Sequence, residues 1–514
     1  MRRYSLLGVL ALLGSAVGTL LPASNSASQG QRDGAAQYAP FFKPVPDCLE
    51  AVHAVNRLTF GARPGDFEQF RSLGCKRWVK EQLHPERIPE NPQLETRLQA
   101  LRSLWVSPAE LHQQTMDSPG ARRGLAEDLA NAKLLRAAYS NRQLFELLDD
   151  FWYNHFNVFL NKGADRDYVS SYERDVIRPH VLGKFYDLLL ATAQSPAMLF
   201  YLDNWQSVGA DSGVTRRSYK RGLNENYGRE LLELHTLGVN GGYTQQDVIN
   251  VARCFTGWTI ASPREGGGFV YKDRWHDKGQ KIVLGHRIKA GGGIDDGLRV
   301  IAILARQPAT AHFISWKLAQ RFVADNPPPS LVDRMAGMFL RNDGDLREVM
   351  RTMLLSPEFW SDGAYRAKVK TPFEMIVSAL RVTDAEVSSA RGLFNEFNKL
   401  GEPLYRKVEP SGYSNANAEW VSSAGLLERM NLANALAYNR IPGVQVDTGL
   451  WPRDESDPLR LAANVLGHPP APETAAALQR SANASPLKPV SLTRPDDIPM
   501  LLGLVLGSPD FQRH

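Results

Sequence analysis

The chain has 514 residues, 43% of them hydrophobic, which is enough apolar sequence to bury a large core. Its 60 basic and 55 acidic side chains give a formal net charge of +5, and the two signs are mixed along the chain instead of forming runs. The composition argues against an intrinsically disordered protein. The mixed charge argues against nucleic-acid binding.

The first 28 residues are typical of a signal peptide. Arg2 and Arg3 precede an apolar stretch from Leu6 to Leu21, and small residues follow over 22–28. The apolar stretch is too short and too rich in Gly and Ser for a membrane span of about 20 residues. We expect cleavage near residues 23–28 and export to the periplasm or the medium, with no transmembrane helix in the mature chain. The paired arginines fit both twin-arginine and ordinary secretory export.

The remainder is predicted to be all-α. Residues 29–45 are small and polar and indicate a flexible lead, and 46–514 indicate a single large, bundle-like helical domain. Apolar residues recur at three- and four-residue steps near 48–58, 66–83, 93–103, 108–115, 120–138, 141–158, 170–195, 226–237, 245–257, 296–305, 308–324, 329–340, 345–354, 371–384, 422–439 and 496–506. The exception is 262–293, where glycines and alternating polar and apolar residues predict a small inserted β-hairpin or ordered loop.

Three cysteines remain after the signal peptide, namely Cys48, Cys75 and Cys254. In an oxidising compartment Cys48 and Cys75 have the opportunity to form a disulfide, with Cys254 as a buried thiol. The alternative is three unpaired, small hydrophobic residues. No Cys/His spacing of a structural zinc site occurs.

The densest polar motif runs from Leu223 to Trp258. At about 100° per residue, Asn226, Glu230 and Glu233 fall within roughly 60° of one another on a helix. Two carboxylates and an amide on one face are typical of metal sites in helical bundles, and equally of an ion-pair lattice in which Arg229 reaches Glu233 and Glu225. In the first interpretation Glu230 and Glu233 are catalytic or metal-binding, and Asn226 and Arg229 contact the substrate.

A second candidate is His155, which projects to the same side of its helix as Leu148, Phe151 and Trp152. A buried neutral imidazole is one interpretation, and a metal ligand or general base with Trp152 at the substrate is the other. We expect His155 to lie within about 10 Å of Glu230 or Glu233, where the three side chains would hold a divalent metal ion or act as acid and base.

The third candidate is in the predicted insertion. His276 and Asp277 can form an oriented acid–base pair, with Lys281 and Arg253 as substrate-binding residues, because loops often carry functional groups on a rigid scaffold. The alternative is that these are solvated loop side chains.

These motifs also carry a family resemblance. The chain resembles the bacterial domain of unknown function 1800 family in the block from Leu223 to Trp258 and in HAVNRLTFGARPGD (His53 to Asp66), FWYNHF (Phe151 to Phe156), WHDKGQKIVLG (Trp275 to Gly285) and SPEFW (Ser356 to Trp360). The resemblance extends from about residue 50 to the C-terminus and implies an exported bacterial protein with mostly helical architecture. It implies no activity. One departure is Gly228, where relatives resemble NENYARE with Ala.

Two functions remain open. No nucleophile elbow, zincin helix, phosphate loop or dinucleotide fingerprint occurs, which disfavours the corresponding enzyme classes. The first hypothesis is an exported metal-dependent or acid–base enzyme that acts on an envelope or extracellular polymer, a polysaccharide or a peptide. The second is a non-catalytic envelope protein that binds or assembles a partner, with its polar residues in a structural lattice. Acids and histidines around an open cleft favour the first, and complete mutual pairing favours the second.

Overall fold

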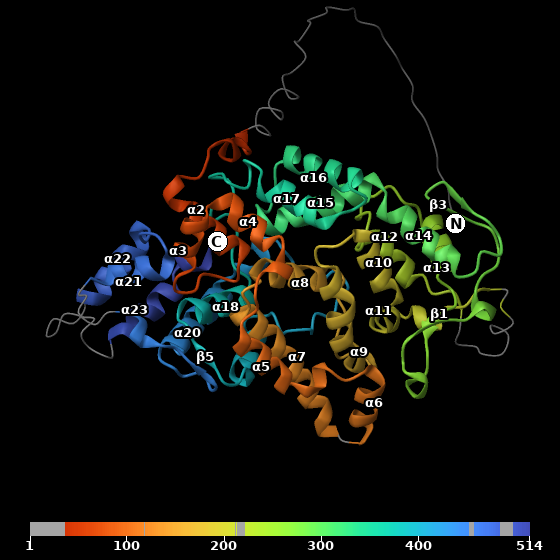
Figure 1. Cartoon of the computed structure of the whole chain (residues 1–514), viewed down its shortest axis with the longest axis horizontal. Helices are drawn as coiled ribbons and strands as arrows, with labels where there is room; N and C mark the ends of the chain where they lie inside the picture. The colour runs from red at the N-terminus through yellow and green to blue at the C-terminus, as the bar shows by residue number, and fades with distance from the viewer. Residues whose placement is uncertain (1–35, 118, 211, 213–221, 452–456, 484–496) are drawn as a thin grey trace, which may run out of the picture.

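The computed structural model describes residues 36–117, 119–210, 212, 222–451, 457–483 and 497–514. The predicted signal peptide lies outside these residues. Helix accounts for 60% of the structure, and the predicted all-α class is confirmed (Figure 1). None of the described helices is long and apolar enough to cross a membrane.

The helices follow one another with short connections. Those of the first half are α2 Asp47–Leu58, α3 Asp66–Leu73, α4 Cys75–Gln82, α5 Pro92–Ala100, α6 Pro108–Asp117, α7 Pro119–Tyr139, α8 Gln143–His155, α9 Asp165–Ser171, α10 Phe185–Gln194, α11 Pro196–Tyr201, α12 Asn226–Glu233 and α13 Gln245–Cys254. Those of the second half are α14 Asp295–Ala305, α15 Pro308–Phe322, α16 Pro329–Arg341, α17 Leu346–Leu354, α18 Pro372–Val382, α19 Arg391–Lys399, α20 Ser423–Ala437, α21 Pro458–Leu466, α22 Pro472–Asn483, α23 Asp497–Leu506 and α24 Pro509–Gln512.

Local sequence explains many helix starts. Proline occupies the first position of several helices, where its missing N–H costs no hydrogen bond. At α18, Thr371 and Glu374 form a capping box, in which each side chain accepts a hydrogen bond from the other residue's backbone N–H. The single helix predicted over 170–195 is wrong. Pro179 lacks an N–H donor, and the chain passes from α9 through a π-helical and a 3₁₀ segment before α10 begins.

Strand is confined to three antiparallel pairs. They are β1 Trp258–Ile260 with β2 Phe269–Tyr271, β3 Lys281–Val283 with β4 His286–Ile288, and β5 Glu386–Val387 with β6 Val444–Gln445. The insertion predicted over 262–293 therefore contains two strand pairs, the first of which begins before it. Leu284 and Gly285 connect β3 to β4 with φ of 48° and 78°, the left-handed conformation that a tight two-residue hairpin requires. The β5–β6 pair was not predicted.

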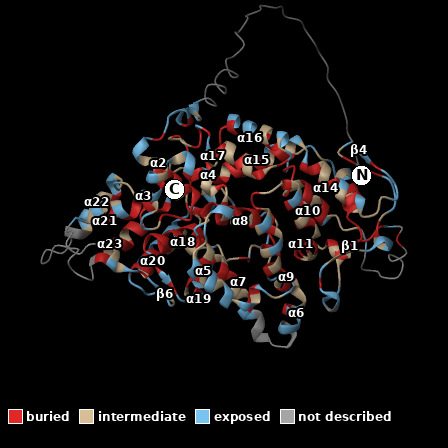
Figure 2. Ribbon diagram, viewed as in Figure 1, coloured by how far each residue is buried: buried red, intermediate tan, exposed pale blue. Residues whose placement is uncertain are grey.

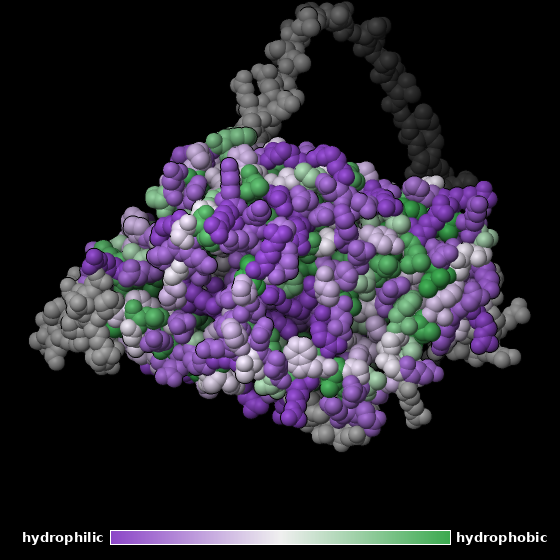
Figure 3. All heavy atoms as spheres, viewed as in Figure 1, coloured by the Kyte–Doolittle hydropathy of each residue, from purple (hydrophilic) through white to green (hydrophobic). Residues whose placement is uncertain are grey.

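The two ends of the described chain pack against each other. Figure 1 shows the first helices beside α21–α23, and Arg57 of α2 donates to the carbonyl of His514, the last residue of the chain, 2.5 Å away. Gly467, with φ of 77°, allows the ring of Phe67 to lie against the backbone after α21. Buried residues run through the middle of the molecule (Figure 2), and hydrophilic residues cover much of the face seen in Figure 3.

The N-terminal lead is more ordered than predicted, and the cysteines follow the unpaired alternative. Residues 29–35 of the predicted flexible lead lie outside the described residues, but the end of the lead is packed, because Phe41 is buried and the Val45 N–H donates to the carbonyl of Trp360 at 3.0 Å. Cys48 and Cys75 form no disulfide in the structure. Cys48 is exposed, Cys75 is half-buried and Cys254 is buried, and all three are free thiols.

Candidate functional site

His155 is a buried side chain at the end of α8. Its Nε2 donates to the backbone carbonyl of His235 at 3.2 Å, and its Nδ1 has no hydrogen-bond partner among the described residues. Burial first, and then the positive charge of Lys317, hold the pKa of His155 well below its usual range. The structure therefore supports the interpretation of His155 as a neutral core imidazole. Trp152 is also fully buried and donates from Nε1 to the carbonyl of Val181, so it does not reach a substrate.

The acids of α12 lie near the surface. Burial, and next the charge of Glu233, raise the pKa of the half-buried Glu230. Glu233 accepts a hydrogen bond from the hydroxyl of Tyr243 at 3.3 Å. Arg229 lies 3.6 Å from the carboxylate of Glu225 but forms no ion pair with Glu233 among the described contacts. One of the two predicted ion pairs of Arg229 is therefore present.

Asn226 does not reach the interior either. It is exposed, its N–H bonds to the side chain of Asn224, and its amide lies 3.4 Å from the carbonyl of Leu202. Across the residues that the structure describes, no three His, Cys, Asp or Glu side chains are grouped to hold a metal ion. The predicted ligands His155, Glu230 and Glu233 are thus not assembled as a metal site.

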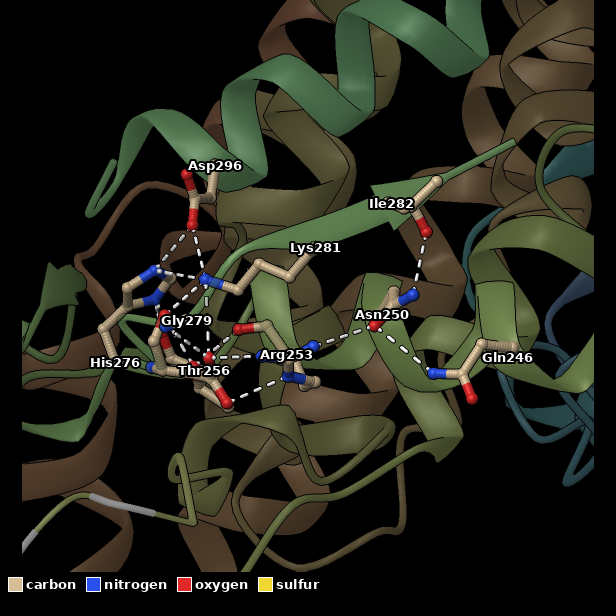
Figure 4. Close-up of polar contacts among 10 residues, drawn as sticks. Gln246, Asn250, Arg253, Thr256, His276, Gly279, Lys281, Ile282 and Asp296 are labelled. Carbon is tan, nitrogen blue, oxygen red and sulfur yellow. Dashed lines mark hydrogen bonds and ion pairs between the residues drawn. The ribbon is translucent and has the colours of Figure 1, made fainter. Parts of the chain in front are cut away.

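His276 and Lys281, by contrast, are joined in one buried network, which we call the lattice (Figure 4). Lys281 Nζ donates to Asp296 Oδ2 at 2.6 Å and to the carbonyl of Asp277. His276 Nδ1 lies 2.8 Å from the carbonyl of Thr256, and its Nε2 lies 3.1 Å from Asp296 Oδ2. Burial acts to raise the pKa of Asp296, but the hydrogen bonds from His276 and Lys281 lower it overall.

Arg253 and Asp277 complete the lattice. The guanidinium group of Arg253 binds both oxygens of Asp277 at 3.0 Å and donates to Asn250 at 2.9 Å. Asn250 in turn donates to the carbonyl of Ile282 in β3, so helix α13 is fixed to the strand. The residues predicted for catalysis and substrate binding in this segment bind one another, and this pairing supports a structural role.

A different group of polar side chains surrounds a cavity of about 40 Å³ at the centre of the molecule, which we call the acid cavity. Helices α7, α8 and α15, the start of α18 and the segment 402–415 supply its walls. The lining residues are Lys133, Asp150, Phe151, Tyr153, Asn154, Asn157, Arg321, Thr371, Phe373, Glu402, Leu404, Tyr405, Tyr413, Ser414 and Asn415. None of them was a predicted site residue.

Glu402 is the unusual group of the acid cavity. Its carboxyl accepts from the backbone N–H of Phe373 at 2.7 Å, and no cation pairs with it within the described chain. The pKa of Glu402 is raised to about 8, mainly by burial. The hydrogen bonds from Phe373 and Thr371 act to lower this pKa, and the charge of Asp150 acts to raise it further. Glu402 is therefore a neutral carboxylic acid at pH 7.

Asp150 has the opposite environment. Lys133 Nζ lies 2.6 Å from the carboxylate of Asp150, and the side chain of Asp150 remains 25% exposed. Lys133 is itself surrounded by the rings of Tyr153, Phe373 and Tyr405, at 5.3–5.5 Å. Burial acts to lower the pKa of Lys133, but the charges of Asp150 and then Glu173 raise it overall. Asp150 therefore has a fixed cationic partner, whereas Glu402 in the same cavity has none among the described residues.

The motif around His155 positions the cavity wall. The side chain of Asn154 donates to the carbonyl of Tyr413 and accepts from its N–H, and Asn157 donates to the carbonyls of Lys407 and Glu409. Gly412 has φ of 71°, and a Cβ there would lie 2.2 Å from the carbonyl oxygen of Asn154. The segment after Glu402 is therefore fixed directly to the end of α8.

Sequence reasoning missed this site for two reasons. Asp150 and His155 are five residues apart, so on a helix they project about 140° from each other. The apolar face on which His155 was singled out is therefore not the face that lines the acid cavity. Glu402 lies in an irregular segment with no periodicity. The one available signal was the group of polar residues on the other side of α8, namely Asp150, Tyr153 and Asn154.

A comparison with protein families matches residues 53–513 to the family described as a protein of unknown function, DUF1800. The match covers most of the chain, which therefore belongs to this family, as its motifs suggested. No curated protein and no solved structure matches it.

Proposed function

We propose that this member of the DUF1800 family is an exported acid–base enzyme that hydrolyses a polysaccharide of the envelope or the extracellular space. The observation that carries the proposal is the pair of carboxyl groups at the acid cavity, in which Glu402 has a raised pKa and Asp150 is ion-paired with Lys133. Two carboxyl groups in contrasting environments are the usual catalysts of glycoside hydrolysis.

In this mechanism Glu402 donates its proton to the oxygen of the leaving sugar. Asp150, on the same cavity, accepts a proton from the water that adds to the anomeric carbon, and exchange with solvent returns both groups to their starting states. A cavity of 40 Å³ holds about three water molecules. Only the scissile linkage and the attacking water fit beside the two acids, and the rest of the polymer lies outside the cavity.

The central test is turnover. The mature protein is incubated with purified cell walls and extracellular polysaccharides, and new reducing ends are measured. We expect Glu402→Gln and Asp150→Asn each to lower the rate about 100-fold or more, since general acid–base catalysis contributes on the order of 10²–10⁴. Glu230→Gln, which changes a half-buried glutamate outside the acid cavity, is the matched control. A Glu402→Gln protein with the wild-type rate would refute the mechanism.

The state of Glu402 is testable without a substrate. The difference infrared spectrum of wild type and Glu402→Gln at pH 6 should contain the carbonyl band of a protonated carboxylic acid, and the band should disappear with a midpoint near pH 8. Activity should decline over the same range because the acid form is lost. A carboxylate signal from Glu402 at pH 6 contradicts the assignment.

Export is proposed from the charged and apolar pattern of residues 2–28. Cell fractionation should recover a shortened protein from the periplasm or medium, whereas a full-length cytoplasmic product contradicts it.

The alternative function is a non-catalytic envelope protein that assembles with a partner. The mutual pairing of His276, Lys281 and Asp296 favours it, because such a lattice fixes structure without leaving a reactive group. The absence of turnover on every polymer, combined with unchanged partner capture by Glu402→Gln, would support this alternative.

A further inference from the structure

We infer that a second, larger cavity beside the acid cavity binds the acidic sugars of a uronate-containing polysaccharide, and this inference rests on the proposed function. The second cavity has a volume of about 740 Å³, within the range of about 300–1,000 Å³ that is typical of ligand sites. We call it the arginine cavity. Its walls come from α7, the start of α9, α19 and the segment 403–406.

The charge of its lining is strongly positive. Four arginines line the arginine cavity, Arg123, Arg166, Arg391 and Arg406, against one acid, Glu127. Arg391 pairs with Glu127 at 2.9 Å. The other three form no ion pair with any described residue, and Arg166 donates from Nε to the carbonyl of Gly163. Among the described residues, no carboxylate neutralises these three guanidinium groups, and this favours the binding of an anion.

The arginine cavity adjoins the acid cavity. Leu404 lines both, two residues beyond Glu402 in the chain. The charge of Arg406 acts on the pKa of Tyr413, which lines the acid cavity. Helix α7 connects the two, with Lys133 at the acid cavity and Glu127 at the other. A polymer held in the arginine cavity thus lies against the segment that carries Glu402.

The three asparagines among the remaining lining residues suit a sugar as the carrier of the negative charge. Arginine binds carboxylates with two parallel hydrogen bonds, which suits the carboxylate of a uronic acid. The side-chain amides of Asn161, Asn395 and Asn398 both donate and accept hydrogen bonds, as sugar hydroxyls require. A wide, solvated cavity of this kind fits an extended acidic polysaccharide better than a small, dehydrated anion.

The test is direct binding with Glu402→Gln, so that turnover does not consume the ligand. Oligogalacturonate is titrated by calorimetry, beside a neutral cello-oligosaccharide and poly-glutamate. We expect oligogalacturonate to bind and the other two ligands not to bind. Adding the double change Arg166→Gln/Arg406→Gln should weaken oligogalacturonate binding at least 10-fold. At high salt the double change should weaken binding by a smaller factor, because salt screens the charges. Arg306→Gln, at an exposed arginine paired with Asp343 outside this cavity, is the matched control. Circular dichroism confirms that each variant is folded.

The outcomes separate the two proposals. Equal affinity for poly-glutamate, or oligogalacturonate binding that ignores Arg166 and Arg406, would overturn the arginine cavity as a uronate site. Arginine-dependent binding by a protein whose Glu402→Gln variant keeps its full hydrolytic rate would keep the binding site and overturn the proposed mechanism instead. Hydrolysis of neutral polysaccharides only, lost with Glu402→Gln, would keep the mechanism and overturn this inference.

Discussion

The lattice around Lys281 is buried and Glu402 of the acid cavity is half-buried. Both regions are rich in charged residues, yet they use these residues in opposite ways. In the lattice, Lys281, His276 and Asp296 satisfy one another. In the acid cavity, Glu402 accepts hydrogen bonds from a backbone N–H and a hydroxyl but forms no ion pair with any described residue, and its pKa is raised to about 8. The density of polar residues in the sequence therefore pointed to the lattice, in which the charged groups pair with one another. The proposed reactive group, Glu402, lies in the acid cavity instead.

The difference has a simple electrostatic origin. A buried carboxylate is tolerated when a cation and hydrogen bonds replace its water, as Lys281 and His276 do for Asp296. When no cation pairs with the carboxylate, burial favours its protonated form instead, as for Glu402. Only the second situation leaves a proton that is available for transfer. Four predictions test whether the two regions differ in this way.

The largest effect should come from removing the lattice cation. Lys281→Met should lower the free energy of unfolding by about 3–5 kcal/mol, because it leaves Asp296 buried without its ammonium partner. Urea unfolding at pH 7 measures the change. Lys278→Met, at an exposed lysine paired with Asp273, is the control and should leave the unfolding midpoint almost unchanged. Equal midpoints for the two variants would show that the lattice is not a stabilising unit.

The response to pH should differ in sign. Because the pKa of Glu402 is raised, its contribution to stability is complete below about pH 4.5 and is lost as the pH rises toward 8, on the order of a few kcal/mol. The pKa of Asp296 is lowered, so its contribution is present above about pH 4 and is lost in acid. Unfolding of wild type and Glu402→Gln is compared from pH 5 to 8.5. The variant should decline less steeply with rising pH than wild type, because Asp149 and Asp165, whose pKa values are also raised, still contribute, and parallel curves would contradict a protonated Glu402.

A smaller effect on stability is expected for Glu402→Gln at pH 6. Since the wild-type group is already neutral, an amide of the same shape should change the free energy of unfolding by no more than about 1 kcal/mol. The same variant should lose polysaccharide hydrolysis, so stability and activity separate. A loss comparable to that of Lys281→Met would place Glu402 in the structural class.

The smallest effect should come from Glu230→Gln. Glu230 is half-buried beside Glu233 and forms no described ion pair, so the change should alter stability by about 0.5 kcal/mol or less. Thermal unfolding with and without a chelator measures it. A chelator-sensitive melting temperature in wild type that Glu230→Gln abolishes would restore the metal site that the sequence suggested.

The sequence by itself determined the local features of this protein. The 3.6-residue periodicity of apolar residues predicted the all-α class, because the buried face of a helix is a property of neighbouring residues. The motifs predicted the family. The apolar face around His155 led to two interpretations, one of which was the buried imidazole that the structure contains. The break after α9 was also readable in principle, because Pro179 cannot continue a helix.

Only the tertiary structure decided which polar groups meet. Lys281 and Asp296 come from a strand and a separate helix, and Glu402 reaches Asp150 and Lys133 from an irregular segment more than 250 residues later in the chain. Whether a buried acid is charged depends on the cations and N–H groups that folding places around it, and those partners come from distant parts of the sequence. For that reason the sequence predicted the helices well, and the acid cavity emerged only when they were packed together.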